Sequence, residues 1–175
     1  MSDLQARLKA TIRDIPDFPK PGIIFKDITP ILSDPDLLQG TVDHLAAAYA
    51  DARIDAVVGM ESRGFIFGAP LALALRAAFV PARKPGKLPY DSIGVEYALE
   101  YGTARLEMHT DAFAPGARVL VVDDLLATGG TAAATNKLIG ELGGEIVANC
   151  FVIELGFLPG REAIGDVPVL SILIY

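Results

Sequence analysis

The feature that most constrains the fold is residues 119–131, VLVVDDLLATGGT, where an apolar run leads through two acids into a loop of small residues. The run Val119–Val122 is typical of a strand that is buried on both faces. Asp123 and Asp124 follow the predicted strand. The small-residue loop then comprises Ala127, Thr128, Gly129, Gly130 and Thr131.

The residues after this loop predict a helix. They read TAAATNKLIGELGG, are rich in Ala and Leu, and close with Gly143 and Gly144. A helix N-terminus that follows glycines presents backbone N–H groups and the positive end of the helix dipole. Phosphate is the usual ligand of such a terminus. The stretch therefore predicts an anion site at the start of a helix.

Strand-like runs and helical spacings alternate along much of the chain, which implies parallel βαβ units with right-handed crossovers. Because 175 residues suit one α/β domain, we predict a single domain over residues 1–175. Its architecture is expected to be α/β, with a central, mostly parallel sheet flanked by helices. The other predicted elements are helices over Leu4–Ile15, Asp36–Ala52 and Phe65–Ala78, and strands over Ile54–Met60, Phe79–Ala82, Ile146–Leu155 and Val169–Ile174.

Two segments interrupt this alternation. The proline-containing FPKPGIIFKDITPIL, which starts at Phe18, predicts a pinned, irregular connector. From Arg83 the chain reads RKPGKLPYDSIGVEYALEY, without a helical period. Alternation from Ile93 predicts one strand of a hairpin-like flap, and Arg105–His109 predicts its return. Long excursions of this kind are usually lids or binding loops, so we predict a flap over residues 83–104.

Charge and composition narrow the possible partners. The net charge of -7 and the pI near 4.7 argue against broad binding to nucleic acid or to an anionic membrane. No apolar signal region is evident at the N-terminus, and the longest uncharged apolar run, Phe65–Leu75, is too short to span a bilayer. We therefore expect a cytoplasmic protein. Cys150, the only cysteine, is expected to be a core residue rather than a reactive thiol.

Three segments with functional residue types follow predicted strands directly. They are Glu61–Gly64, Arg83–Lys87 and Asp123–Thr131. Ligands of parallel α/β sheets bind at the carboxyl ends of the strands. The three segments are therefore expected to converge on one site.

The chemistry of the central stretch points to a sugar phosphate. The loop has no lysine before its last hydroxyl residue and does not fit GxGxxG, so neither a P-loop nor a dinucleotide site is indicated. Asp123 and Asp124 would repel a phosphate unless they face hydroxyl groups or a cation. A ligand with a phosphate at one end and vicinal hydroxyls nearby is a ribose 5-phosphate.

These residues resemble a known family. VLVVDDLLATGGT is similar to the phosphoribosyl-diphosphate-binding motif of the phosphoribosyltransferases. FPKPGIIFKDITPIL, VVGMESRGFIFGAPLA, VPARKPGKLP and YALEYGTARLEMH together resemble the adenine phosphoribosyltransferases, in that family's order, over most of the chain from Phe18 to Leu142. The resemblance implies a type I phosphoribosyltransferase fold with a flap or hood. It also implies purine salvage, in which adenine N9 joins C1 of 5-phosphoribosyl diphosphate, giving AMP and diphosphate through an oxocarbenium-like transition state.

The same resemblance implies how the donor is bound. It gives Asp123 and Asp124 the ribose hydroxyls, and it places Arg63 in a diphosphate loop with a non-proline cis peptide at Glu61-Ser62. A guanidinium suits bidentate phosphate recognition. The loop residues that would hold the 5-phosphate are Ala127, Thr128, Gly129, Gly130 and Thr131, and the flap residues that would bind the diphosphate are Arg83, Lys84 and Lys87.

The base and the chemical step are assigned by resemblance to two further segments. Phe25 would pack on the adenine ring, with backbone groups of Ile24 and Lys26 reading its edge, inside a base-binding segment over residues 18–30. Lys26 stands where the family often has arginine. Glu100 and Tyr101 match the family's motif at the return of the flap. Glu100 would act as the general acid or base at the purine, and Tyr101 would contact the substrate.

The resemblance further implies Mg²⁺ carried mainly by the substrate, with no direct protein ligand, and a homodimer. Two alternatives are weaker. One is a phosphoribosyltransferase for a 6-oxopurine or a pyrimidine, against which FPKPGIIFKD and LEYGT argue. The other is a regulatory protein that senses the sugar phosphate and binds nucleic acid, which would call for a basic surface or an added DNA-binding module.

Overall fold

The computed structural model describes residues 2–98 and 103–175. Two compact units are present, residues 1–44 and residues 45–175.

The first unit contains a helix, a small hairpin and a short helix. Helix α1 (Asp3–Thr11) begins with a capping box between Ser2 and Gln5. Strands β1 (Arg13–Pro16) and β2 (Ile24–Asp27) pair antiparallel, and α2 (Thr29–Leu32) follows. The predicted first helix is therefore too long, because its last residues pair with β2. The predicted irregular connector contains a strand and a helix.

Helix α3 (Pro35–Ala48) starts in the first unit and continues into the second. The Asp34 carboxylate accepts hydrogen bonds from the backbone N–H groups of Asp36 and Leu37, at 3.0 and 3.1 Å. A side chain that caps the first turn in this way stabilises the helix start. The structure confirms the helix that the apolar spacing predicts, with bounds shifted by a few residues.

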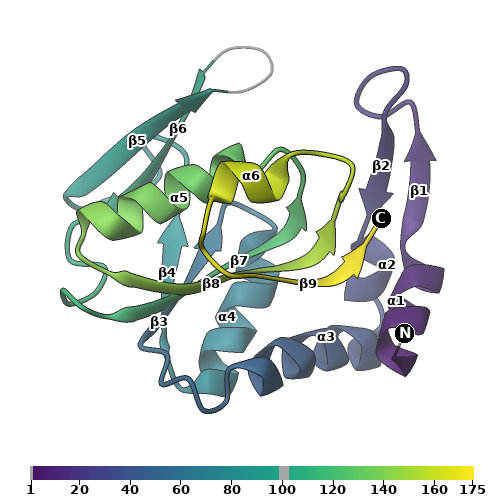
Figure 1. Cartoon of the computed structure of the whole chain (residues 1–175), viewed down its shortest axis with the longest axis horizontal. Helices are drawn as coiled ribbons and strands as arrows, with labels where there is room; N and C mark the ends of the chain where they lie inside the picture. Colours follow the sequence, from purple (N-terminus) through teal and green to yellow (C-terminus); the bar gives the residue numbers. More distant parts are fainter. Residues whose placement is uncertain (1, 99–102) are drawn as a thin grey trace. The chain divides into compact units, whose positions relative to one another are not determined.

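A five-stranded parallel sheet forms the centre of the second unit (Figure 1). Its order is β4-β3-β7-β8-β9, and every neighbouring pair is parallel. The run Val119–Val122 lies in the middle strand and is fully buried, as predicted. The strands are β3 (Ala56–Met60), β4 (Ala78–Ala82), β7 (Arg118–Leu126), β8 (Glu145–Glu154) and β9 (Val169–Ile174).

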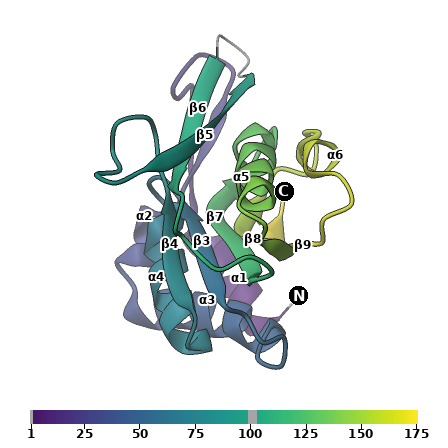
Figure 2. The same ribbon diagram turned by 90° about the vertical axis from the view of Figure 1, so that its left-hand side faces the viewer.

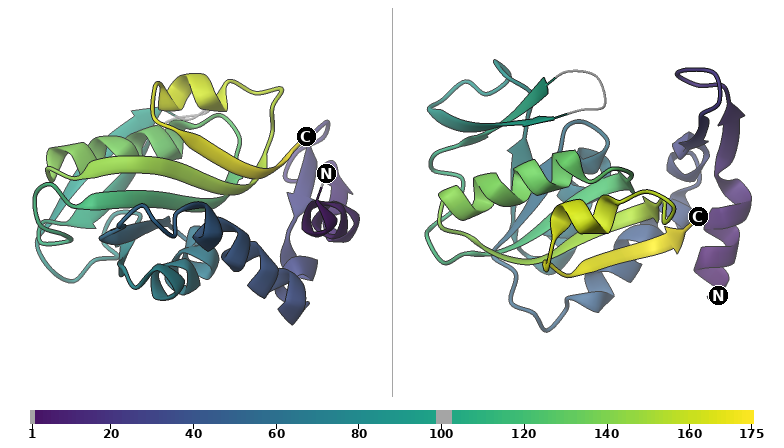
Figure 3. Two further views of the ribbon diagram at one scale, coloured as in Figure 1. Left: turned by 60° about the horizontal axis from the view of Figure 1, so that its bottom comes forward. Right: turned by 45° about the horizontal axis from the view of Figure 1, so that its top comes forward.

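Helices cover both faces of this sheet. Helix α4 (Gly64–Leu75) lies on one face, and α5 (Gly130–Glu141) and α6 (Gly160–Ile164) lie on the other (Figures 1 and 3). The structure confirms the predicted fold class. The short helix α6 was not predicted from the sequence. Among the described residues, no helix has both the length and the apolar character needed to cross a bilayer.

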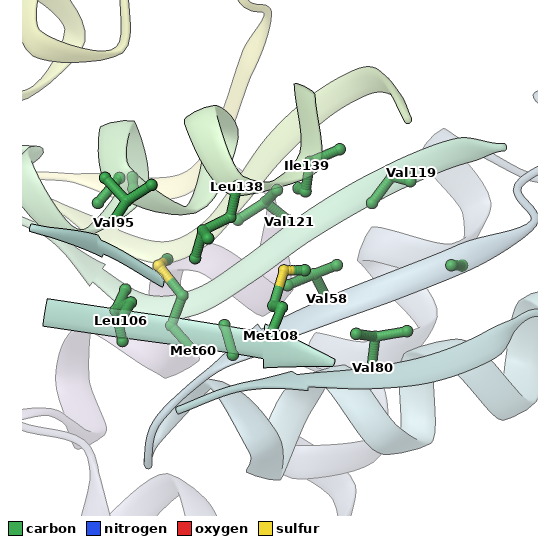
Figure 4. Packing of buried hydrophobic residues seen from close by; sticks show 14 of the residues in the cluster. Val58, Met60, Val80, Val95, Leu106, Met108, Val119, Val121, Leu138 and Ile139 are labelled. Atoms are coloured by element: carbon green, nitrogen blue, oxygen red, sulfur yellow. The ribbon is translucent and has the colours of Figure 1, made fainter. Parts of the chain in front are cut away.

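A two-stranded antiparallel hairpin, β5 (Ser92–Ala98) and β6 (Thr103–His109), lies alongside α5 (Figure 2). Val95 and Leu106 of the hairpin join the buried cluster formed by the sheet and α5 (Figure 4). Helix α5 contributes Leu138 and Ile139, together with Ala132 and Ala134, to this cluster. The hairpin predicted from the alternation is confirmed, and its inner face is part of the core.

Strand β7 is longer than the sequence indicates. It continues through Asp123 and Asp124, because Leu125 and Leu126 still pair with β8. The prediction that the strand ends before the acids is therefore wrong. Because Asp123 and Asp124 lie within β7, a strand of the sheet and not a loop holds the two carboxylates. Successive side chains of a strand point to opposite faces.

Candidate active site

The three segments that follow predicted strands meet at one edge of the sheet. Glu61–Gly64 follows β3, Arg83–Lys87 follows β4, and β7 carries Asp123 and Asp124 at its carboxyl end. Since β4, β3 and β7 are consecutive in the sheet, their carboxyl ends are neighbours. The structure confirms the expected convergence for the described residues of these segments.

The small-residue loop lines a cavity of about 90 Å³ together with Met60, Asp123 and Phe151. Gly129, at φ +81°, is the N-cap of α5, and Gly130 is the first helical residue. Within the described part of the chain, no side chain caps this terminus. The first N–H groups of a helix have no partner inside the helix, so this cavity is suited to an anion.

A second cavity of about 210 Å³ adjoins the first through Asp123, which lines both. Its other lining residues are charged or polar. They combine cations and acids from three strand ends: Glu61, Ser62, Arg63, Lys84 and Asp124. The two cavities therefore share the Asp123 carboxylate: one lies at a helix N-terminus, and the other is lined by the cations Arg63 and Lys84.

Arg63 and Asp124 form an ion pair through the arginine Nε and the carboxylate Oδ2. The Asp124 side chain is 4% exposed and the Arg63 side chain 47% exposed, so the acid is buried and the guanidinium reaches toward the cavity. A guanidinium carries five N–H donors and can bind more than one acceptor. The pair compensates the charge of the buried Asp124.

Asp123 lies in a different electrostatic setting. Burial raises the pKa of its carboxyl well above the ordinary value, and the neighbouring Asp124 carboxylate raises it further. Arg63 acts in the opposite direction but is the smallest influence. The Asp123 Oδ1 also accepts the Asp124 backbone N–H at 2.9 Å. Asp123 is thus an acid whose charged form lacks full compensation and is suited to a hydrogen-bonding ligand.

Glu61 connects the two cationic segments through contacts that the sequence reasoning did not predict. Its Oε2 accepts hydrogen bonds from the Arg83 Nε at 3.2 Å and from the Lys84 backbone N–H at 3.0 Å. Burial raises the pKa of Glu61, but the bonds to Lys84 and Arg83 together outweigh it and lower that pKa. No local sequence signal marks this contact, because the partners are more than twenty residues apart.

Arg83 and Lys84 are placed differently by this contact. The Arg83 guanidinium contacts Glu61, the Lys87 carbonyl oxygen at 3.2 Å, and the ring of Phe65 at 5.9 Å from its centroid. The Lys84 ammonium makes no ion pair with any group in residues 2–98 and 103–175. Lys84 is therefore the cation that this segment presents to the second cavity.

The flap is anchored at its base and along α5. Arg83 and Glu107 exchange two backbone hydrogen bonds, of 2.9 and 2.7 Å, and the Glu107 carboxylate accepts the Gly86 N–H at 3.1 Å. Thr131 of the small-residue loop and Tyr97 of the hairpin share a hydroxyl–hydroxyl bond of 3.3 Å. Tyr97 and Glu107 are further residues that sequence reasoning did not find.

The predicted base-binding residues belong to the first unit. The rings of Phe18 and Phe25 meet edge to face at 5.2 Å, and Ile24 is 58% exposed. Lys26 forms an ion pair with Asp14, directly opposite it in the hairpin, at 2.6 Å. In the second unit, the Glu61-Ser62 peptide is cis, as the resemblance implies.

The remaining predicted residues are Glu100, Tyr101, Lys87 and Cys150. Glu100 and Tyr101 lie outside the described residues. Lys87 is exposed, between the turn at Pro85 and Gly86 and strand β5. Cys150 is fully buried, and burial raises the pKa of its thiol to about 12. The prediction that Cys150 is a core residue is confirmed.

Comparison with known proteins agrees with this geometry. The family described as "Phosphoribosyl transferase domain" matches residues 31–168, which is most of the chain. The chain therefore belongs to the phosphoribosyltransferases.

The relatives narrow the class. An adenine phosphoribosyltransferase of Sorangium cellulosum is 59% identical over 95% of this chain and 86% of its own length. A crystal structure of the enzyme of that name from Thermoanaerobacter pseudethanolicus is 48% identical, with a TM-score of 0.95 over 98% of this chain and 99% of its own. The Saccharomyces cerevisiae enzyme, solved with adenine and an imino-altritol bisphosphate, is 42% identical, with a TM-score of 0.94 over 99% and 100%. The chain belongs to the adenine phosphoribosyltransferase family.

Proposed function

We propose that this chain is a purine-salvage enzyme that transfers the phosphoribosyl group of 5-phosphoribosyl diphosphate to N9 of adenine, giving AMP and diphosphate. The observation that supports this most directly is the pair of cavities that share Asp123 as a lining residue. A donor with a phosphate at C5 and a diphosphate at C1 needs two anion sites separated by groups that accept hydrogen bonds from the ribose hydroxyls. We treat residues 1–175 as one functional domain.

In this proposal, different residues bind the 5-phosphate and the ribose of the donor. The loop Ala127–Thr131 and the N-terminus of α5 bind the 5-phosphate through backbone N–H groups. Asp123 and Asp124 accept hydrogen bonds from the ribose hydroxyls. Because these groups are held on a strand and at a helix start, the ribose is positioned before its bond to diphosphate breaks, which lowers the entropic part of the barrier.

The diphosphate is assigned to Arg63 and Lys84, which line the second cavity. As the C1–O bond lengthens, negative charge grows on the diphosphate, and fixed cations stabilise it. Arg83 acts in this proposal mainly by holding Lys84 in place, since its guanidinium already contacts Glu61. Lys87 and Tyr101 complete the set of substrate contacts on the flap.

The residues present suit Mg²⁺ that is carried by the substrate. Asp123 and Asp124 supply hard oxygen atoms beside the second cavity, and Mg²⁺ prefers oxygen ligands and keeps several waters when it binds with phosphates. When bound, Mg²⁺ neutralises charge on the leaving diphosphate. We assign no protein side chain as its direct ligand.

The adenine ring is assigned to the 18–30 segment, where Phe25 stacks on the base and backbone groups of Ile24 and Lys26 read its edge. Adenine donates from its amino group where a 6-oxopurine accepts, so backbone groups can discriminate between them. This assignment rests on the resemblance, on the aromatic ring of Phe25 and on the exposure of Ile24.

The test of the function is an assay with each base separately. Purified protein is incubated with phosphoribosyl diphosphate, Mg²⁺ and one of adenine, hypoxanthine, guanine or uracil. We expect nucleotide only from adenine, as AMP. A nucleotide formed faster from hypoxanthine or guanine would favour the 6-oxopurine alternative, and binding of phosphoribosyl diphosphate without product from any base would favour a metabolite sensor.

Glu100 is proposed as the general acid or base at the purine. Glu100→Gln should lower kcat by about 10²–10⁴-fold, the usual contribution of such a group. The KM for phosphoribosyl diphosphate should change little, because that substrate is bound elsewhere. Steady-state kinetics with each substrate varied in turn separates the two constants. An unchanged kcat would refute the role, and the exposed Glu162→Gln on α6 serves as the control.

We also propose a homodimer that works in the cytoplasm. Helix α4 has no charged residue between Gly64 and Leu75 and exposes Ile66 and Leu73, the latter to 80%. An apolar helix face that stays in water is unfavourable and is typical of a subunit interface. The cytoplasm is where a phosphorylated and impermeant donor would be available.

A further inference from the structure

The outer side of the phosphate loop is in direct backbone contact with the start of α6. A Cβ atom on Gly129 would collide with the carbonyl oxygen of Gly160 and lie 2.9 Å from the Cβ of Ala163. A Cβ atom on Gly160 would collide with the carbonyl oxygen of Ala127 and lie 2.8 Å from the Cγ of Leu126. The two backbones therefore touch with no side chain between them.

This contact involves the part of the loop that binds the phosphate in our proposal. Residues 127–131 have small side chains and offer little surface for packing of their own. A loop that directs several backbone N–H groups at one phosphate must keep its shape to within a fraction of an ångström. The rigidity must therefore come from neighbouring elements, and α6 lies beside the N-terminal end of α5 (Figures 1 and 3).

The start of α6 is itself fixed to the sheet. Arg161 donates two hydrogen bonds to Glu154, from Nε to Oε1 and from Nη2 to Oε2, both 2.7 Å long. Glu154 is the last residue of β8, and its side chain is only 7% exposed. A bidentate pair of this kind defines orientation as well as distance. Next to it, the Leu155 N–H donates to the Leu126 carbonyl oxygen at 2.9 Å, immediately before the loop.

We propose that Gly160 and the Glu154–Arg161 pair are positioning residues for the 5-phosphate: they hold the outer side of the Ala127–Thr131 loop in the shape that binds the phosphate. The proposal rests on the function proposed above. The sheet fixes Glu154, Glu154 fixes Arg161, and the adjacent Gly160 backbone supports the loop. Neither Gly160 nor Arg161 touches the substrate.

The decisive variant is Gly160→Ala, because its new methyl group would displace the Ala127 carbonyl. The matched control is Gly140→Ala, in α5, where a Cβ atom would meet no heavy atom within 4 Å. Ribose 5-phosphate is the probe for the 5-phosphate subsite, because it lacks a diphosphate. Isothermal titration should show that Gly160→Ala weakens its binding by about tenfold or more, while magnesium diphosphate and adenine bind within about twofold of the parent. Gly140→Ala should leave all three unchanged.

A second variant keeps the test valid if Gly160→Ala does not fold. Arg161→Met should weaken ribose 5-phosphate binding by a smaller factor, and Arg161→Lys should restore part of the loss, since it keeps the charge but not the bidentate geometry. Equal weakening of ribose 5-phosphate, diphosphate and adenine would overturn the proposal, because a general loss of structure affects every ligand. Unchanged binding in both variants would overturn it too. Failure of the proposed function would appear separately, as a parent protein that makes no AMP.

Discussion

Asp123→Asn should yield a protein that is more stable and much less active. Activity should fall by roughly 10²-fold in kcat/KM for phosphoribosyl diphosphate, since a hydrogen bond to a charged acceptor is worth about 1.5–3 kcal/mol. Stability near pH 7 should rise by about 1 kcal/mol, or about 2–4 °C in Tm for a chain of this size. The physical reason is that burial and the adjacent Asp124 disfavour the charged form of Asp123 in the folded protein.

The sign of the pH dependence follows from the raised pKa. Above the unfolded pKa of about 3.9, the folded protein holds a proton on Asp123 that the unfolded chain has lost. The folded state binds more protons there, so the contribution of this group to stability falls as the pH rises from that value through the folded pKa. Asparagine removes this dependence. Urea unfolding of parent and variant between pH 5 and pH 8 measures the difference, which should grow with pH.

The control for Asp123→Asn is a substitution at an exposed aspartate. Asp166→Asn changes the net charge by the same amount at an exposed position after α6 and should alter neither kcat/KM nor the free energy of unfolding. If Asp123→Asn were less stable than the parent across this pH range, another group would have to stabilise the charged Asp123 carboxylate in the parent protein. If it kept full activity, the ribose hydroxyls would have to bind elsewhere.

Lys84→Met should lower the rate of AMP formation at least as much as Asp123→Asn lowers kcat/KM. Removing one preorganised group that stabilises developing charge typically costs about 2.7–4 kcal/mol, or about 10²–10³-fold in kcat. Lys84 is suited to this role because Glu61 holds its backbone beside the second cavity, and because its ammonium has no ion-pair partner in the part of the chain that the structure describes. Steady-state and single-turnover rates of AMP formation measure the loss.

The control for Lys84 is Lys137→Met, which removes the same charge from the exposed surface of α5, where Lys137 faces Glu141 at 3.9 Å. Its kinetics should match the parent. An additional variant, Glu61→Gln, should lower the rate of AMP formation by an intermediate factor. It weakens the hydrogen bond that Glu61 accepts from the Lys84 backbone but keeps the Lys84 cation. Parent-like turnover of Lys84→Met would contradict its assignment to the diphosphate and leave Arg63 as the principal cation.

The ion pair between Arg63 and Asp124 explains how opposite charges can share this site before substrate binds. A buried carboxylate without a partner is strongly unfavourable, and Arg63 compensates Asp124. A sequence reading assigns the two residues to different parts of the substrate, the diphosphate and the ribose. The structure adds that they are partners, so a variant of either one changes the electrostatics of the other.

The sequence by itself determined the elements whose signals are local. The apolar run Val119–Val122, the glycines at the helix start and the alternating residues of the flap each act through their own backbone and nearest neighbours. For the same reason the helix start at α5 and the parallel α/β class were predictable. The order of strand ends along the chain also indicated the convergence at the carboxyl edge, since that rule depends on connectivity alone.

Only the tertiary structure decided the contacts between segments that are distant in sequence. Pairing with β8 extends β7 through Asp123 and Asp124, which no property of those two residues reveals. The order β4-β3-β7 places Glu61 against Lys84, and the packing of α6 places Gly160 against the small-residue loop. Propensity and periodicity describe a residue's immediate neighbours, whereas these contacts depend on which strands lie side by side and on how closely two backbones can approach.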